Sequence, residues 1–128
     1  MERPYLRPNG MVLDSADPRG LADFYQRLLG WRRRSDEPDW ITLVPPEGGI
    51  GLSFQGEPAH VPPVWPAKDG DPRMQVHLDV EVHDLATAVT WAEQQGATVA
   101  AFQPQDDVRV MIDPAGHPFC LWQPENQD

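Results

Sequence analysis

One pattern of apolar and polar positions occurs twice along the chain. Its first copy begins with the apolar positions Met11 and Leu13, which indicate a strand. Asp17 and Pro18 follow, and these residue types are typical of the N-cap and the first position of a helix. Apolar residues then recur at helical spacing up to Gly30, a residue type that commonly ends helices. The apolar positions of this predicted helix are Leu21, Phe24, Tyr25 and Leu28.

The second copy of the pattern lies in the C-terminal half. Asp84, the predicted N-cap of a second helix, stands 67 positions after Asp17. Gly96 ends that helix as Gly30 ends the first. The predicted strand before this helix has its apolar positions at Leu78, Val80 and Val82. The helix itself has its apolar positions at Leu85, Ala88, Val89 and Ala92.

Each predicted helix is followed by three strand-like segments. After the first helix these segments are WRRRS, DWITLV and IGLSFQ, and after the second they are ATVAAF, VRVMI and PFCLW. The stretch between the two halves is too rich in proline for a helix or a central strand. The sequence therefore predicts an α+β fold of two βαβββ modules in a single domain spanning 1–128. The first module covers about 8–56, the connector 57–73 and the second module about 74–124.

The composition and net charge of the chain make some classes of binding partner less favourable than others. The chain has 128 residues, with 20 acidic and 10 basic residues, for a formal charge of −10. This charge disfavours binding to nucleic acid or to an anionic membrane surface, and it mildly favours a cationic ligand. No apolar run approaches the length of a membrane span. Because Cys120 is the only cysteine, a reducing, cytoplasmic location is expected.

Three segments carry a resemblance to a known superfamily. The segments ADPRGLADFYQRLLGW, HLDVEVHDL and DPAGHPFCLW resemble the vicinal-oxygen-chelate superfamily, which includes glyoxalase I, bleomycin-resistance proteins and extradiol dioxygenases. The resemblance implies that the two modules form one cupped, mixed sheet with the helices on its convex side. It also implies a ligand cleft on the concave side. In metal-using members, that side carries the metal ligands.

Only some of the residues at the metal-ligand positions that the resemblance implies can coordinate a metal. One position lies seven residues before each helix-capping aspartate, where this sequence has His77 in the second module and Gly10 in the first. Another lies in the last strand of each module. This position is Cys120 in the second module and falls near Leu52 in the first. Glycine and leucine offer no ligand atom, so half of the implied set is missing.

The remaining residues make a weak metal site. Open catalytic sites usually have three protein ligands, and the matched positions supply only His77 and Cys120. Asp79 alternates with His77 on one strand face and is a further candidate ligand. We expect no bound metal and no other cofactor, with a divalent metal as the alternative. Cys120 is either one half of a Cys–His pair or a small buried apolar residue.

Further candidates for ligand contacts are aromatic or basic. Trp122 is two residues from Cys120 and is expected on the same strand face. Trp40 and Phe54 are candidates for the half of the cleft that the first module supplies. Arg73 is a candidate for holding an anionic group of a ligand. An aromatic cleft with a few polar groups is typical of small-molecule sites.

Two functions of different class follow from these residues. The first is a small-molecule-binding protein without metal chemistry, which sequesters a drug or metabolite as bleomycin-resistance proteins do. The second is a metal-dependent lyase, isomerase or dioxygenase of glyoxalase type. The incomplete ligand set favours the first, and the resemblance implies that the protein acts as a homodimer. Whether any reaction is catalysed stays open at this point.

Overall fold

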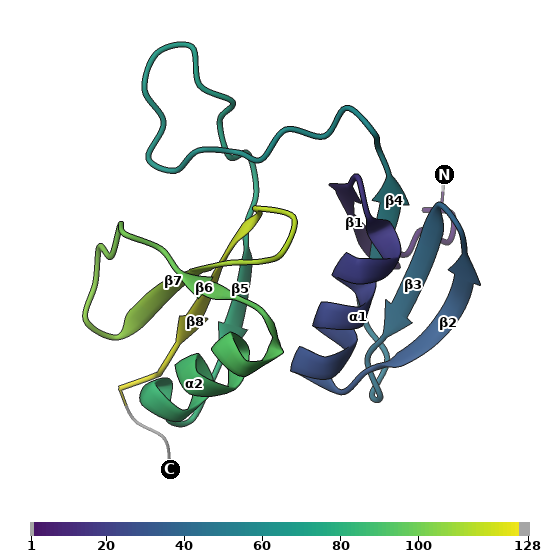
Figure 1. The fold of residues 1–128 in the computed structure, drawn as a ribbon. Helices are drawn as coiled ribbons and strands as arrows, with labels where there is room; N and C mark the ends of the chain where they lie inside the picture. Colours follow the sequence, from purple (N-terminus) through teal and green to yellow (C-terminus); the bar gives the residue numbers. More distant parts are fainter. Residues whose placement is uncertain (1, 126–128) are drawn as a thin grey trace. The chain divides into compact units, whose positions relative to one another are not determined.

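The computed structural model describes residues 2–125, and its chain divides into two compact units, residues 1–58 and 59–128 (Figure 1). Each unit holds one βαβββ module with a mixed four-stranded sheet and a helix, as the sequence predicts. Residues 59–73 of the predicted connector belong to the second unit. Among the described residues, no helix has the length and apolar character that crossing a bilayer requires.

The first unit is a sheet in the order β1-β4-β3-β2, with α1 against it. Strands β1 and β4 are parallel, whereas β4, β3 and β2 are antiparallel neighbours. This order brings the first and last strands of the module side by side. The elements are β1 (Gly10–Ser15), α1 (Pro18–Leu29), β2 (Arg32–Glu37), β3 (Trp40–Val44) and β4 (Gly51–Gly56).

The second unit repeats this arrangement with a sheet in the order β5-β8-β7-β6 and with α2 against it. Strands β5 and β8 are parallel, and β8, β7 and β6 are antiparallel neighbours. One strand is shorter than its sequence suggests, because ATVAAF forms only the two-residue β6. The elements are β5 (Leu78–Glu81), α2 (Leu85–Gln95), β6 (Thr98–Val99), β7 (Val108–Ile112) and β8 (Pro118–Trp122).

Both helices begin at the predicted aspartates. The Asp17 carboxylate accepts a hydrogen bond of 3.0 Å from the Gly20 backbone N–H, and Asp84 accepts one of 3.3 Å from Thr87. These bonds satisfy N–H groups that have no partner within the helix. Gly30 ends α1 with a φ of 72°, a left-handed conformation that favours glycine.

In each unit the helix covers one face of the sheet, and the core lies between them. In the first unit Phe54 of β4 is fully buried and stacks on Tyr25 of α1 with ring centroids 5.7 Å apart. Alternate residues therefore lie on the other face, where Thr42 and Ser53 hydrogen-bond at 3.1 Å. The fully or almost fully buried apolar residues on the corresponding side of the second unit include Ala92, Met111, Phe119 and Leu121.

The connector is held against the second unit by contacts of its own. His60 Nε2 lies 2.9 Å from the Ala115 carbonyl oxygen, and the His60 ring lies 4.8 Å from that of His117. Gly116 has a φ of +89°, and Pro62 occupies the space that a Cβ at position 116 would need. The start of the connector is therefore held against the turn between β7 and β8.

Candidate functional site

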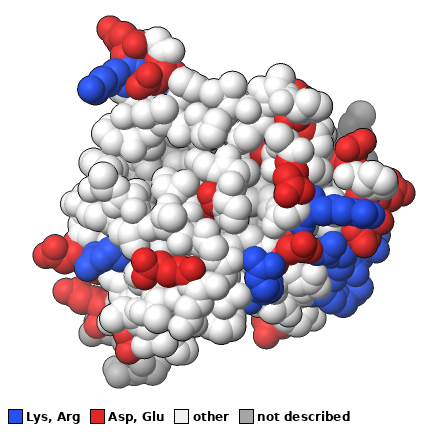
Figure 2. Space-filling model, in the orientation of Figure 1, with Lys and Arg blue, Asp and Glu red and all other residues white. Residues whose placement is uncertain are grey.

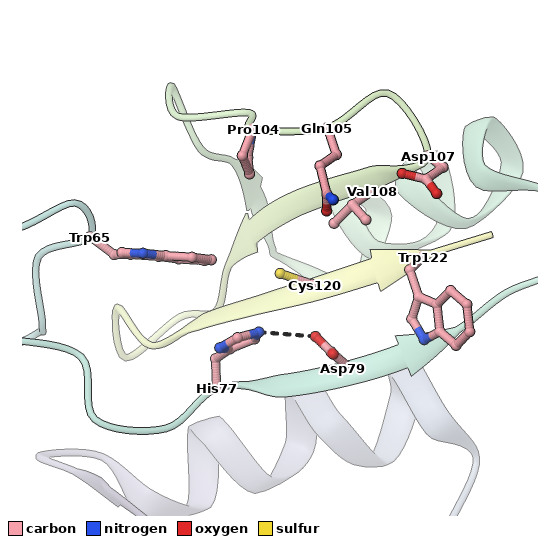
Figure 3. A pocket seen from close by; sticks show the side chains of 9 residues that line it. All are labelled: Trp65, His77, Asp79, Pro104, Gln105, Asp107, Val108, Cys120 and Trp122. Carbon is pink, nitrogen blue, oxygen red and sulfur yellow. Dashed lines mark ion pairs between the residues drawn. The ribbon is translucent and has the colours of Figure 1, made fainter. Parts of the chain in front are cut away.

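The second unit contains a pocket of about 500 Å³ (Figure 3). Its walls come from β5, β8, the connector and the segment that leads into β7. This volume lies within the range of pockets that bind small organic molecules. The lining residues are Trp65, His77, Asp79, Pro104, Gln105, Asp107, Val108, Cys120 and Trp122.

Strand register explains why side chains from three strands meet there. Asp79 of β5 lies opposite Cys120 of β8, and Val108 of β7 lies opposite Trp122 of β8. Because side chains alternate along a strand, these residues share the sheet face away from α2. Phe119, the neighbour of Cys120 in β8, points to the opposite face and is fully buried in the core. One face of this sheet therefore builds the core, and the other builds the floor of the pocket.

Three polar side chains meet on that floor. His77 Nε2 lies 3.0 Å from Asp79 Oδ1, and the side chains are 30% and 61% exposed (Figure 3). The Cys120 thiol also hydrogen-bonds to Asp79, although Cys120 itself is only 4% exposed. Because a carboxylate only accepts, the imidazole N–H and the thiol S–H are both donors to it. Asp79 is thus the shared acceptor of the group.

The state of the thiol follows from its surroundings. Burial, the charge of Asp79 and the hydrogen bond to its carboxylate together raise the pKa of Cys120 from 9.0 to about 11, and burial is the largest of the three causes. The thiolate is the nucleophilic form of cysteine, and it is scarce at neutral pH under these conditions. Cys120 therefore acts here as a small hydrogen-bond donor and not as an activated nucleophile.

Two tryptophans flank the polar floor. The Trp65 ring stacks on the His77 ring at a centroid distance of 5.1 Å and meets Phe102 edge-on at 5.4 Å. Trp122 lies at the far end of β8, and Cys120 and Asp79 lie between the two indoles (Figure 3). The connector thus supplies one aromatic wall, and the last strand supplies the other.

The structure brings together four of the seven residues that the sequence proposes as ligand contacts. These four are His77, Asp79, Cys120 and Trp122. Arg73 is exposed, lies 3.8 Å from Asp69 and does not line this pocket. The contact with an anionic group of a ligand that the sequence suggests for Arg73 stays a prediction.

The other two residues, Trp40 and Phe54, lie in the first unit. The structure corrects the assignment of Phe54 as a ligand contact. Phe54 points toward α1 and is part of the core, so it does not line an open cleft. Trp40 is half-buried and pairs with Gln55 in the β3–β4 register. It lies on the opposite sheet face from Ile41, which is fully buried.

Five lining residues are not among the seven ligand contacts that the sequence proposes. Trp65 lies in a proline-rich segment without periodicity, and only its residue type could have drawn attention to it. Pro104, Gln105, Asp107 and Val108 come from a segment that joins two strands and has no recognisable motif.

Comparison with known proteins identifies the family. The glyoxalase-like domain matches residues 10–122. This chain belongs to that family. The resemblance to the vicinal-oxygen-chelate superfamily is thereby confirmed, whereas no curated protein matches the chain.

Solved structures share the glyoxalase-like fold at low sequence identity. A glyoxalase/bleomycin resistance protein/dioxygenase family enzyme from Burkholderia phytofirmans PsJN is 16% identical, with a TM-score of 0.67 over 92% of this chain and 98% of that one. TnmS3, an antibiotic binding protein from Streptomyces sp. CB03234, is 17% identical, with a TM-score of 0.63 over 97% and 100%. A glyoxalase/bleomycin resistance protein/dioxygenase from Alicyclobacillus acidocaldarius is 18% identical, with a TM-score of 0.62 over 93% and 92%.

The residues that could hold the metal of a glyoxalase-like enzyme are His77, Asp79 and Cys120. Within residues 2–125, one ligand atom of each lies within 4.8 Å of the other two. An ion would have to break the pair between His77 and Asp79 and take the thiol proton, because only the thiolate is a good ligand. The set also lacks the several oxygen ligands that magnesium or manganese prefers. The three side chains contact one another, so a metal ion would bind there only by displacing these contacts.

Proposed function

We propose that this glyoxalase-like protein binds a small planar aromatic molecule that carries a positive charge, and that it does so with its own side chains. The ligand would lie between Trp65 and Trp122 with its charged edge toward Asp79. The observation that carries the proposal is the pocket of about 500 Å³ with aromatic walls and a carboxylate at its centre. Sequestration of a drug or metabolite is the corresponding role.

Aromatic walls and acidic charge both support a cation. Indole faces attract cations, and aromatic rings stack on them with little loss of freedom. The nine lining residues include Asp79 and Asp107 and no lysine or arginine. Residues 59–128 contain 11 acidic and 3 basic residues, a formal charge of −8 for the unit that holds the pocket. On the face seen in Figure 2, acidic side chains are spread widely, and most basic ones gather on the right of the view, with smaller basic patches at the left and upper left.

The comparisons support the same class of function at a coarser level. One structural neighbour is named an antibiotic binding protein, which is consistent with ligand binding on this fold. At 17% identity, that likeness concerns the fold, so the choice of ligand depends on the pocket of this chain. The proposal includes a homodimer, which the resemblance to the superfamily implies, and a cytoplasmic location, which the single cysteine suggests.

A pair of tricyclic probes with opposite charge tests the proposal. We expect 9-aminoacridine, a cation at neutral pH, to quench tryptophan fluorescence saturably with one site per chain. We expect 9-anthracenecarboxylate, an anion of similar shape, to bind roughly tenfold or more weakly, because cation–aromatic and charge-assisted contacts each contribute on the order of 1 kcal/mol or more. Fluorescence titration measures both dissociation constants.

Three variants assign the effect to the pocket. Asp79→Asn should remove most of the preference for the cation, and Trp65→Ala should weaken both probes. Gln94→Ala, on the exposed surface of α2, should leave both dissociation constants unchanged. Absence of saturable binding by either probe would count against the proposal, and so would an undiminished cation preference in Asp79→Asn.

A metal-dependent enzyme of glyoxalase type is the second candidate, because three ligand atoms meet within 4.8 Å. We expect the purified protein to contain less than stoichiometric zinc, nickel, iron and manganese by elemental analysis, and calorimetric titration with zinc to show no tight site. One equivalent of metal in the wild type, lost in His77→Ala, would favour a lyase, isomerase or dioxygenase instead.

A further inference from the structure

The ladder between β6 and β7 stops at a defined point. Thr98 pairs with Ile112 and Val99 with Met111, and the Ala100 N–H still donates to the Val110 carbonyl at 3.0 Å. Continued pairing would have the Val110 N–H donate to the Ala100 carbonyl. That bond is replaced, and the main chain of residues 100–107 leaves the sheet at this position.

The side chain of Gln103 fills the place of the missing pairing. Its Oε1 accepts from the Val110 N–H at 2.9 Å, and its Nε2 donates to the carbonyls of Val110 and Ala100, each at 2.9 Å. Both amide hydrogens and one oxygen lone pair of the side chain are therefore used. A primary amide carries the same donor and acceptor groups as the backbone of a strand residue. Here the Gln103 amide bridges Ala100 and Val110 at the point where the two strands separate.

The segment that leaves the sheet builds one side of the pocket. Phe102 meets the Trp65 ring edge-on, and Trp65 in turn stacks on His77. Pro104 and Gln105 line the pocket directly (Figure 3). Gln103 stands between Phe102 and Pro104 in the chain, and its three hydrogen bonds anchor the segment to the sheet.

We propose that Gln103 is the positioning residue of the ligand pocket. Its amide substitutes for a strand residue against Val110, and this holds residues 102–105 and the Trp65 ring in place before a ligand arrives. The proposal rests on the proposed function, since it assigns Gln103 to the site where the aromatic cation would bind. It adds a residue that does not line the pocket and that touches no ligand.

The chemistry of position 103 predicts which replacements fail. Leucine has a similar volume and offers neither donor nor acceptor, so it leaves the Val110 N–H unpaired. Glutamate can still accept from that N–H, but it turns a carboxylate oxygen toward the two carbonyls that Nε2 now contacts. We expect Gln103→Leu and Gln103→Glu to loosen the segment, whereas Gln94→Glu on the exposed surface of α2 should not.

Two readouts test the proposal, and one of them needs no ligand. In the ligand-free protein, Gln103→Leu should speed hydrogen exchange of the Val110 amide and of residues 100–107. It should also raise acrylamide quenching of Trp65, taken as the difference between each protein and its Trp65→Phe counterpart. With 9-aminoacridine, the dissociation constant should rise roughly tenfold, the change expected when one or two net hydrogen bonds are lost.

Asp84→Ala serves as the control for general destabilisation of the second unit. It removes the cap of α2 but leaves the Gln103 contacts intact, so it should leave Trp65 quenching and the dissociation constant unchanged. Equal effects in Asp84→Ala and Gln103→Leu would overturn the positioning role. Unchanged exchange and quenching in Gln103→Leu would also overturn it. If wild type binds neither probe, the proposed function fails, while the exchange and quenching results still decide the role of Gln103.

Discussion

Replacing Phe54 by alanine is expected to lower the free energy of unfolding by about 3–5 kcal/mol. The Phe54 ring is fully buried and stacks on Tyr25, so its loss leaves a cavity between β4 and α1. A cavity at such a site removes both the transfer free energy of the ring and its packing contacts. Urea denaturation followed by circular dichroism gives the change in free energy, provided that the slope with denaturant is unchanged.

Trp40→Ala is the matched test for the other face of the same sheet. Trp40 is only half-buried, so we expect a loss of about 1–2 kcal/mol, in the ordinary range for single substitutions. Phe54→Leu keeps most of the apolar volume and should cost much less than Phe54→Ala. A Phe54→Ala protein of wild-type stability would place Phe54 outside the core, and the interpretation as a cleft residue would then return.

The helices could be predicted because their signals are local. Asp17 and Asp84 accept hydrogen bonds from N–H groups three residues ahead, and the glycine at each C-terminal end adopts a positive φ. Neither feature depends on residues far away in the sequence. Because the same signals occur twice, the two βαβββ modules could also be predicted.

The faces of β3 and β4 could not be assigned from the sequence. Apolar residues fall on both faces of DWITLV, so alternation does not say which face a helix covers. Packing against α1 decides it, and Phe54 goes to the core together with Ile41 and Leu43. The end of β6 is a similar case, since ATVAAF looks like a strand until Gln103 takes over the pairing with Val110.

The residues of the pocket floor could be predicted from the sequence, whereas only some of those in its walls could. His77, Asp79, Cys120 and Trp122 follow from strand alternation and from the ligand positions of the superfamily. Trp65 depends on contacts with His77 and Phe102, which no periodicity in the connector indicates. A wall that is built from a loop is thus visible only once the loop is placed against the sheet.

The Cys120 thiol is expected to react with iodoacetamide at pH 8 at least about 100-fold more slowly than the thiol of the unfolded chain. Its pKa is raised from 9.0 to about 11, which lowers the thiolate fraction about 100-fold at pH values below both. Burial slows access further. Mass spectrometry of the alkylated protein, with and without urea, measures the two rates.

The same pKa shift predicts how stability depends on pH. Between pH 9 and pH 11 the unfolded chain loses the thiol proton and the folded chain keeps it. The contribution of this group to stability is therefore complete below pH 9 and is lost as the pH rises to about 11, by on the order of 2–3 kcal/mol. Cys120→Ala should lack this part of the pH dependence.

Asp79→Asn separates the effect of burial on the pKa of Cys120 from the effect of the neighbouring carboxylate. It also tests whether the thiol is a neutral hydrogen-bond donor in the pocket. Without the carboxylate, burial alone holds up the pKa of Cys120, so alkylation should become faster than in wild type but stay slower than in the unfolded chain. A fast wild-type reaction would instead mean a thiolate at neutral pH. The Cys–His alternative would then replace the neutral donor, and the pocket would contain a nucleophile.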